Sequence, residues 1–169
     1  MSTIDVPVAL LGHGTVGSAV SRLLVENAED IERATGHRLR LVRALVRDPA
    51  KERSFLPDPG ILTTDFADVA RDPDVALVAD VMGGIEPAGS YVLELLRSGK
   101  PVVSANKQLI ARRGAELFGA ASRAGVTSLV ATIKLASTLA IRSRTPANSR
   151  AASIGGSLSP LSSKVSAMI

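Results

Sequence analysis

The sequence predicts an α/β protein built on a doubly wound parallel sheet. Two observations predict this fold: short apolar segments alternate with amphipathic segments through residue 126, and most of the apolar segments end at glycine or at a polar residue. Strands that alternate with helices form βαβ units, whose crossovers cover both faces of a parallel sheet with helices. The 169 residues suffice for one domain with a buried core.

The expected strands are continuous apolar runs, typical of strands buried on both faces. They cover residues 6–11, 39–46, 75–82, 101–104 and 126–131. The expected helices show apolar residues at helical spacing, with a glycine following three of them. They cover residues 15–34, 65–71, 87–98 and 107–124, and residues 47–60 are expected to form a loop rich in proline.

Composition excludes several classes of protein. The chain has no cysteine, which excludes disulfides, thiolate metal sites and a cysteine nucleophile. No apolar run reaches the roughly 18 residues that span a bilayer, and the N-terminus lacks the basic start of an export signal. We therefore expect a cytoplasmic protein with no membrane partner.

The net charge of +4 is unevenly distributed. Residues 1–126 hold 15 Lys and Arg against all 16 Asp and Glu, whereas residues 127–169 hold five basic residues and no acid. This basic segment has no aromatic residue to stack on bases, so we expect no nucleic-acid partner. It is rich in Ser, Ala and Thr without a period of 2 or 3.6, and we expect residues 127–169 to form a poorly ordered tail after a domain of residues 1–126.

A glycine-rich motif of the form GxGxxG follows the first expected strand and opens the first expected helix. Its residues are Gly12, His13, Gly14, Thr15, Val16 and Gly17. In a dinucleotide-binding, Rossmann-like fold, the first glycine permits the turn, the second admits the pyrophosphate, and the third lets helix and strand pack closely. The alternative is a purely structural turn. The His13 side chain is expected to be a tolerated loop residue that reaches a cofactor only through its backbone.

The end of the second expected strand carries the cofactor preference. An arginine there accommodates the 2′-phosphate of NADP, whereas an acidic residue binds the ribose hydroxyls of NAD. Arg47 comes first and Lys51 adds a second cation, which favours NADP(H), while Asp48 leaves NAD(H) open. An ordinary charged surface loop is the alternative.

Two further motifs follow later strands. Gly83 and Gly84 allow a flat ring to lie close to the backbone, or they form a plain turn into a helix. Asn106 suits a helix cap, which places Lys107 in the first turn, where a cation opposes the helix dipole. A nearby anion or a reacting oxygen explains such a lysine, as does a side chain that points into water. Because all four motifs follow strands, we expect them along one edge of the sheet.

The segments ALLGHGTVG (residues 9–17), DVMGGIEPA (80–88) and GKPVVSANKQLIA (99–111) together resemble homoserine dehydrogenase over about residues 6–126. The resemblance implies NADP(H)- or NAD(H)-linked interconversion of aspartate 4-semialdehyde and L-homoserine, on the route to threonine and methionine. It also implies that Arg47 and Lys51 hold the 2′-phosphate and that Ser104 and Lys107 lie beside the nicotinamide. Lys107 is then the catalytic residue that polarises or protonates the substrate oxygen.

The resemblance ends near residue 126, where the family continues into a substrate and dimerisation domain. We therefore expect a truncated chain with weak cofactor binding and little turnover, whereas full-length members form homo-oligomers. An out-of-frame tail is one hypothesis for residues 127–169. Two alternatives stay open: a nucleotide-binding module without catalysis, and another small-molecule dehydrogenase such as an aspartate dehydrogenase.

Overall fold

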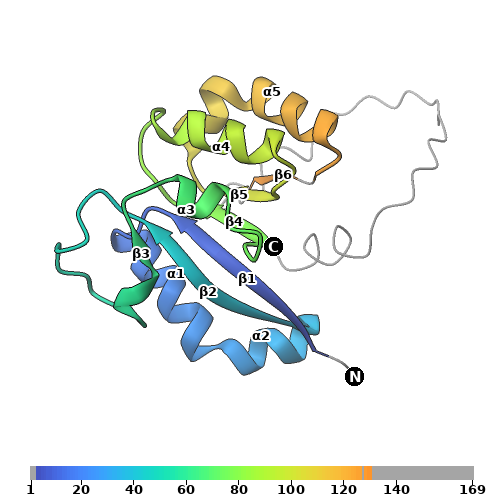
Figure 1. The fold of residues 1–169 in the computed structure, drawn as a ribbon. Coiled ribbons are helices and arrows are strands. Elements are labelled where there is room, and N and C mark those ends of the chain that lie inside the picture. Colours follow the sequence, from blue (N-terminus) through green and yellow to red (C-terminus); the bar gives the residue numbers. More distant parts are fainter. Residues whose placement is uncertain (1–2, 127, 131–169) are drawn as a thin grey trace, which may run out of the picture. The chain divides into compact units, whose positions relative to one another are not determined.

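The structure is a computed structural model that describes residues 3–126 and 128–130 (Figure 1). The expected tail therefore lies almost wholly outside the described residues. A compact unit comprises residues 1–131. Its described part contains no helix that is both long enough and apolar enough to cross a membrane.

The sheet has six parallel strands in the order β3-β2-β1-β4-β5-β6. The strands are β1 (Ile4–Leu11), β2 (His37–Leu45), β3 (Leu62–Thr63), β4 (Leu77–Asp80), β5 (Val102–Ser104) and β6 (Ser128–Val130). The chain runs outward in one direction from β1 to β3 and then returns to the other side of β1 with β4. The order therefore reverses between β1 and β4, and the prediction of a doubly wound, Rossmann-like sheet is confirmed.

The helices connect these strands. They are α1 (Thr15–Glu26), α2 (Ala28–Thr35), the 3₁₀ helix η1 (Pro59–Ile61), α3 (Ala67–Ala70), α4 (Ala88–Arg97) and α5 (Lys107–Ala124). The predicted bounds of α5 agree with the structure. Gly36, Gly99 and Gly125 follow α2, α4 and α5 with φ of 72°, 84° and 68°, as their position after the helices predicts.

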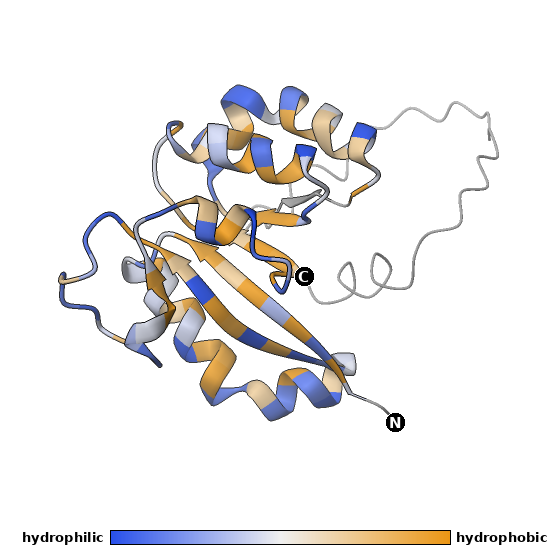
Figure 2. Ribbon diagram, in the orientation of Figure 1, coloured by the Kyte–Doolittle hydropathy of each residue, from blue (hydrophilic) through white to orange (hydrophobic). Residues whose placement is uncertain are grey.

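Each face of the sheet has its own apolar core, built from the hydrophobic residues of the strands and helices (Figure 2). Ala9 and Leu11 of β1 belong to the larger cluster, with residues of α3, α4 and α5. Leu10, between them, packs in a second cluster with Ala44 and Ile61, against which Val20 of α1 lies. This alternation along β1 is the reason that an uninterrupted apolar run is needed: both faces of the strand are buried.

The first predicted helix is wrong in one respect, because residues 15–34 form two helices. Asn27 lies between α1 and α2 with φ −109° and ψ 17°, outside helical geometry. No residue of α2 is buried, so tertiary packing does not favour a single straight helix. Asparagine, a weak helix former, then allows the chain to bend.

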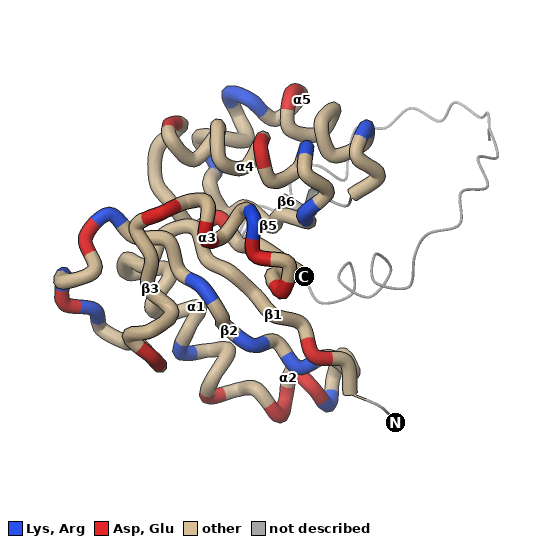
Figure 3. The backbone as a smooth tube through the Cα atoms, viewed as in Figure 1, with Lys and Arg blue, Asp and Glu red and all other residues tan. Residues whose placement is uncertain are grey.

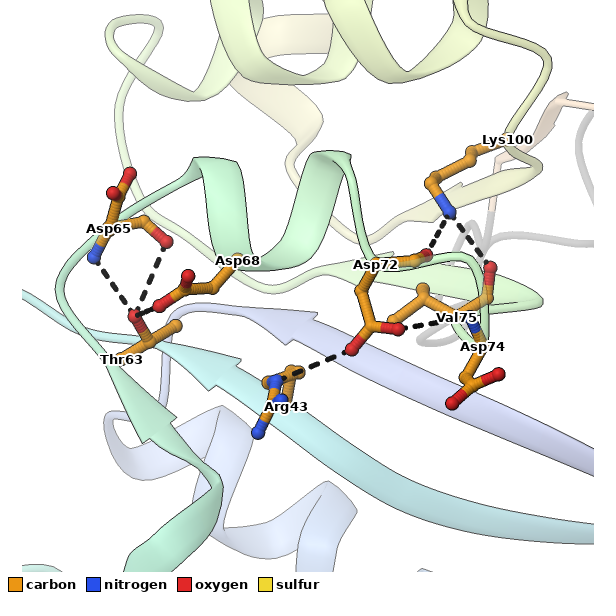
Figure 4. A network of polar contacts seen from close by, with 8 residues as sticks. All are labelled: Arg43, Thr63, Asp65, Asp68, Asp72, Asp74, Val75 and Lys100. Atoms are coloured by element: carbon orange, nitrogen blue, oxygen red, sulfur yellow. Dashed lines mark hydrogen bonds and ion pairs between the residues drawn. The ribbon is translucent and has the colours of Figure 1, made fainter.

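A polar network ties together the connections at the amino ends of β4 and β5 (Figure 4). The Lys100 ammonium donates hydrogen bonds to the backbone oxygens of Asp72 (2.7 Å) and Val75 (3.1 Å). The Asp72 carboxylate accepts the backbone N–H of Asp74 at 2.9 Å and lies 3.4 Å from the Arg43 guanidinium of β2. The contacts of Lys100 thus lie at the sheet edge opposite to the one that carries the predicted motifs, and Arg43 joins them from the carboxyl half of β2.

Candidate dinucleotide-binding site

The four predicted motifs follow β2, β1, β4 and β5, which are neighbours in that order in the sheet. Parallel strands end at a common edge, so the structure brings the motifs together at the carboxyl edge, around the reversal between β1 and β4 (Figure 1). In an open α/β sheet this is the position of the ligand crevice.

The three glycines of the motif differ in what surrounds them. Gly12 has φ +93°, and a Cβ there would lie 3.1 Å from Met82 Cγ and 3.4 Å from Met82 Cα. A Cβ on Gly17 would lie 2.6 Å from the Gly12 backbone oxygen, closer than atoms can pack. A Cβ on Gly14 would meet nothing within 4 Å. Gly12 and Gly17 are thus required by the packing of the fold, whereas Gly14 leaves open space in front of the helix.

The N-terminus of α1 is equipped to hold an anion. Gly14 is its N-cap and provides no side-chain hydrogen bond, and the first turn contains no acidic residue. Thr15 and Val16 in this turn are exposed. The positive end of the helix dipole therefore lacks a carboxylate from its own first turn, which suits a phosphate ligand.

His13 is a structural residue, which corrects the expectation of a tolerated loop side chain. It is 3% exposed, and its Nε2 lies 2.7 Å from Ser21 Oγ of α1. Its Nδ1 lies 3.5 Å from Ser18 Oγ. Burial lowers the pKa of His13, and the Arg53 guanidinium lowers it further. The imidazole therefore links the glycine-rich loop to the underside of α1 in its neutral form.

The segment after β2 carries exposed basic residues interspersed with acidic ones (Figure 3). Arg47 and Lys51 are exposed, and no ion pair joins either of them to a residue that the structure describes. The Asp48 carboxylate accepts the backbone N–H of Ala50 at 2.9 Å. The acidic residue is thus engaged in a turn of its own loop, which favours the two cations over Asp48 as cofactor contacts.

Arg53 orders this loop, and the sequence analysis did not identify it. Its guanidinium donates to the backbone oxygens of Pro49 (3.0 Å), Asp48 (2.6 Å) and Lys51. An arginine bound to three carbonyl groups holds the loop that follows Arg47 in a compact form. No sequence pattern distinguishes this role from that of any other charged loop residue.

The segments after β4 and β5 form the other half of the site. Gly83 is exposed, and Gly84 has φ +83°, a conformation that favours glycine. Asn106 caps α5, as predicted, by accepting the backbone N–H of Leu109 at 3.1 Å. Lys107 is the exposed first residue of α5. Ser104 is 4% exposed, and its hydroxyl bonds to Asp80, so its side chain is already engaged within the protein.

Asp80 is a second residue that the sequence analysis did not identify. It is 0% exposed at the end of β4, and its carboxylate accepts the Ser104 hydroxyl at 2.7 Å and the Met82 N–H at 3.0 Å. Burial raises the pKa of this carboxyl group, and the two hydrogen bonds oppose that rise. A lone acid in an otherwise apolar predicted strand was the available signal, because a buried carboxylate requires partners.

The comparisons with known proteins agree on one family. The family model described as "Homoserine dehydrogenase, NAD binding domain" matches residues 12–131. The homoserine dehydrogenase of Bacillus subtilis is 40% identical over 118 residues, which cover 70% of this chain and 27% of that protein. The chain thus spans about a quarter of the length of this curated relative.

Solved structures show the same fold. A homoserine dehydrogenase from Thiobacillus denitrificans superposes with a TM-score of 0.71 at 40% identity, covering 77% of this chain and 30% of that one. A hyperthermophilic archaeal homoserine dehydrogenase, solved in complex with NADPH, superposes with a TM-score of 0.60 at 19% identity, covering 75% of this chain and 44% of that one.

Proposed function

This chain belongs to the homoserine dehydrogenase NAD-binding domain family, and we propose that it is the cofactor domain of an NADP(H)-linked homoserine dehydrogenase. The observation that carries the proposal is the position of the acid-free N-terminus of α1. It lies within the glycine-rich motif at the sheet reversal, and two exposed cations follow the neighbouring strand β2. This combination fits a dinucleotide with a 2′-phosphate.

The residues have separate roles in this proposal. The loop from Gly12 to Gly17 holds the pyrophosphate through backbone N–H groups, with open space at Gly14 for its approach. Arg47 and Lys51 hold the 2′-phosphate. Gly83 and Gly84 admit the nicotinamide, beside the backbone of Ser104. The NADPH found with the archaeal family member supports this choice of cofactor.

When bound, NADPH would supply the hydride that reduces aspartate 4-semialdehyde to L-homoserine, and NADP⁺ would accept the hydride in the reverse direction. Lys107 is the catalytic residue of the proposal: it donates a hydrogen bond or a proton to the substrate oxygen that gains charge. Its position supports this role, because a lysine at the first position of α5 opposes the helix dipole and gains nothing in stability from it. For the complete enzyme we also propose a cytoplasmic location and a homo-oligomer.

A titration with NADPH and with NADH tests the cofactor assignment. Arg47→Ala is expected to weaken NADPH binding about tenfold, because a charge-assisted hydrogen bond to phosphate is lost, and to leave NADH binding unchanged. Arg38→Ala is the matched control, since Arg38 is an exposed arginine near the amino end of β2, whereas Arg47 follows the carboxyl end of this strand. Equal losses for both cofactors, or none, would contradict the role of Arg47.

Turnover is tested separately from binding, by following NADPH oxidation with aspartate 4-semialdehyde. Oxidation above the substrate-free rate, abolished by Lys107→Met with NADPH affinity retained, supports the dehydrogenase. Binding of NADPH without oxidation is expected both of a nucleotide-binding module and of a cofactor domain tested by itself, so it would leave the binding role standing and the catalytic role of Lys107 unsupported.

A further inference from the structure

A buried chain of hydrogen bonds crosses the carboxyl edge of the sheet from β4 to α5. The Asp80 carboxylate receives the Ser104 hydroxyl at 2.7 Å, and Ser104 Oγ accepts the backbone N–H of Asn106 at 3.1 Å. The Asn106 amide donates to the Gly84 backbone oxygen at 2.6 Å. The three side chains are 0%, 4% and 6% exposed, respectively. The chain of hydrogen bonds therefore starts at Asp80, the last residue of β4, returns to Gly84 in the connection that follows this strand, and is shielded from water.

The same groups fix the start of α5. Asn106 Oδ1 accepts the Leu109 N–H at 3.1 Å, so one side chain caps the helix and holds the Gly84 turn. The Asp80 backbone oxygen also accepts the Ala105 N–H at 2.9 Å. Lys107 immediately follows the cap. The residues that set the backbone position of Lys107 therefore also hold the Gly83–Gly84 turn.

The chain also reaches the glycine-rich motif. The Met82 N–H donates to Asp80 Oδ1 at 3.0 Å, and Met82 is the residue that a Cβ on Gly12 would meet. The Val81 N–H donates to the Leu11 backbone oxygen at 3.0 Å. Asp80 therefore holds Met82, which packs on Gly12 after β1. Through Ser104 and Asn106 it also holds Gly84, which is hydrogen-bonded to the start of α5.

A buried carboxylate at position 80 is energetically unfavourable if its role is only structural. Burying a carboxylate is unfavourable unless hydrogen bonds compensate, and burial indeed raises the pKa of Asp80. No basic side chain forms an ion pair with it in the described part of the chain. Such a cost at the edge where the ligand crevice lies is typical of residues that position a site.

We propose that Asp80 is a positioning residue for the nicotinamide half of the cofactor, acting through Ser104 and Asn106 on the Gly83–Gly84 turn and on Lys107. The inference rests on the proposed function, since it assumes that a nicotinamide dinucleotide occupies the carboxyl edge. It adds a residue that contacts neither cofactor nor substrate. None of these three side chains hydrogen-bonds to the segments after β1 and β2, which hold the adenosine half in the proposed function.

Asp80→Asn is the sharpest test because it keeps the shape of the side chain. With its amide oxygen facing the Met82 N–H, its NH₂ group donates to Ser104 Oγ, which already accepts from Asn106. The Ser104 proton then loses its acceptor. Asp72→Asn is the matched control: the Asp72 carboxylate also accepts the N–H two residues on, with a second partner on its other oxygen, but at the amino edge.

Two probes separate the halves of the site. NADPH carries both halves, and its fluorescence reports the environment of the nicotinamide, whereas 2′,5′-ADP carries only the phosphorylated adenosine half. Asp80→Asn is expected to weaken NADPH binding about tenfold and to reduce the emission change on binding, while 2′,5′-ADP affinity stays within about twofold. Asp72→Asn is expected to change neither affinity.

Asn106→Ser provides a second variant in case Asp80→Asn does not fold. Serine retains a helix cap but removes the amide that donates to Gly84. The same selective loss of NADPH binding is expected. Equal losses for NADPH and 2′,5′-ADP in the folded variants, or unchanged NADPH binding and emission, would overturn the positioning role. Failure of the wild-type chain to bind either probe would instead overturn the proposed function.

Discussion

The second and third glycines of the glycine-rich motif, Gly14 and Gly17, are glycine for different physical reasons, which a pair of matched substitutions separates. Gly17→Ala places a Cβ 2.6 Å from a backbone oxygen that cannot move without opening the β1 turn. We expect it to lower the free energy of unfolding by about 2–4 kcal/mol. Gly14→Ala enters open space at a negative φ of −88°, so its cost to stability is expected to stay below about 1 kcal/mol.

The same pair is expected to differ in cofactor binding. The Gly14→Ala methyl group occupies the space through which a pyrophosphate approaches, so NADPH affinity falls about tenfold in a stable protein. Urea unfolding and an NADPH titration on both variants measure the two effects. A stable Gly14→Ala protein with unchanged NADPH affinity would contradict the assignment of this loop to the pyrophosphate.

His13 makes the stability of the fold dependent on pH. Its pKa is lowered in the folded protein, first by burial, so the unfolded chain binds the proton more readily, with a pKa of about 6.5. The unfolded state is therefore favoured as pH falls below this value, and the contribution of neutral His13 is present above it. We expect the melting temperature to fall between pH 7.5 and 5.5.

His13→Gln removes this titration while keeping a polar side chain near Ser21. Its melting temperature is expected to fall less over the same range. His37 is present in both proteins, so the difference between them isolates His13. Parallel pH profiles for the two proteins would show that the buried imidazole does not carry the dependence.

At the scale of secondary structure, the elements predicted from the sequence agree with the structure where they are buried in the core. The limits of α5 were predictable because Asn106 and Gly125 mark both ends and its apolar face packs in the core. The break at Asn27 was not, because α2 has no buried residue to set its direction. The two-residue strand β3 follows the loop rich in proline, and its pairing with β2 is a long-range contact with no local pattern.

The candidate site shows the same division. Glycines and exposed cations after strands were visible in the sequence, because conformational freedom and charge are properties of single residues. The Asp80–Ser104–Asn106 chain and the loop-ordering role of Arg53 were not, because they depend on which backbone atoms meet in space. The Asp80 carboxylate within a predicted strand was the one local sign of this chain of hydrogen bonds.

The connections at the amino edge support the fold without taking part in the site. Lys100→Met removes a cation that donates to the backbone oxygens of Asp72 and Val75 (Figure 4). We expect the free energy of unfolding to fall by about 1–3 kcal/mol, since hydrogen bonds from a charged donor are lost. NADPH affinity is expected to stay within about twofold.

Lys51→Met is the reciprocal control for Lys100→Met. Lys51 is exposed, and no ion pair joins it to a described residue. Its substitution is expected to leave stability unchanged within about 0.5 kcal/mol while weakening NADPH binding. Chemical denaturation and the titration are measured on the same samples. Loss of NADPH binding in Lys100→Met at full stability would show that the two edges are coupled.

At the scale of the whole molecule, the strand order explains why residues distant in sequence respond to one ligand. The order β2-β1-β4-β5 places the ends of four strands side by side, although the motifs span residues 12–107. A ligand that contacts all four ends must slow their opening together. At a hundred times its dissociation constant, NADPH is expected to stabilise the fold by about 2.7 kcal/mol.

Amide hydrogen exchange with and without NADPH tests this distribution. Slower exchange is expected in four peptides at once, covering residues 12–18, 46–51, 82–84 and 104–108. Peptides at the amino edge, residues 35–39, 72–76 and 99–102, are expected to change only where they exchange by global unfolding. Protection confined to residues 12–18 and 46–51 would mean that the adenosine half binds while the nicotinamide half is not held. Since the reversal between β1 and β4 separates these two halves, that result would locate the failure at the connection that Asp80 controls.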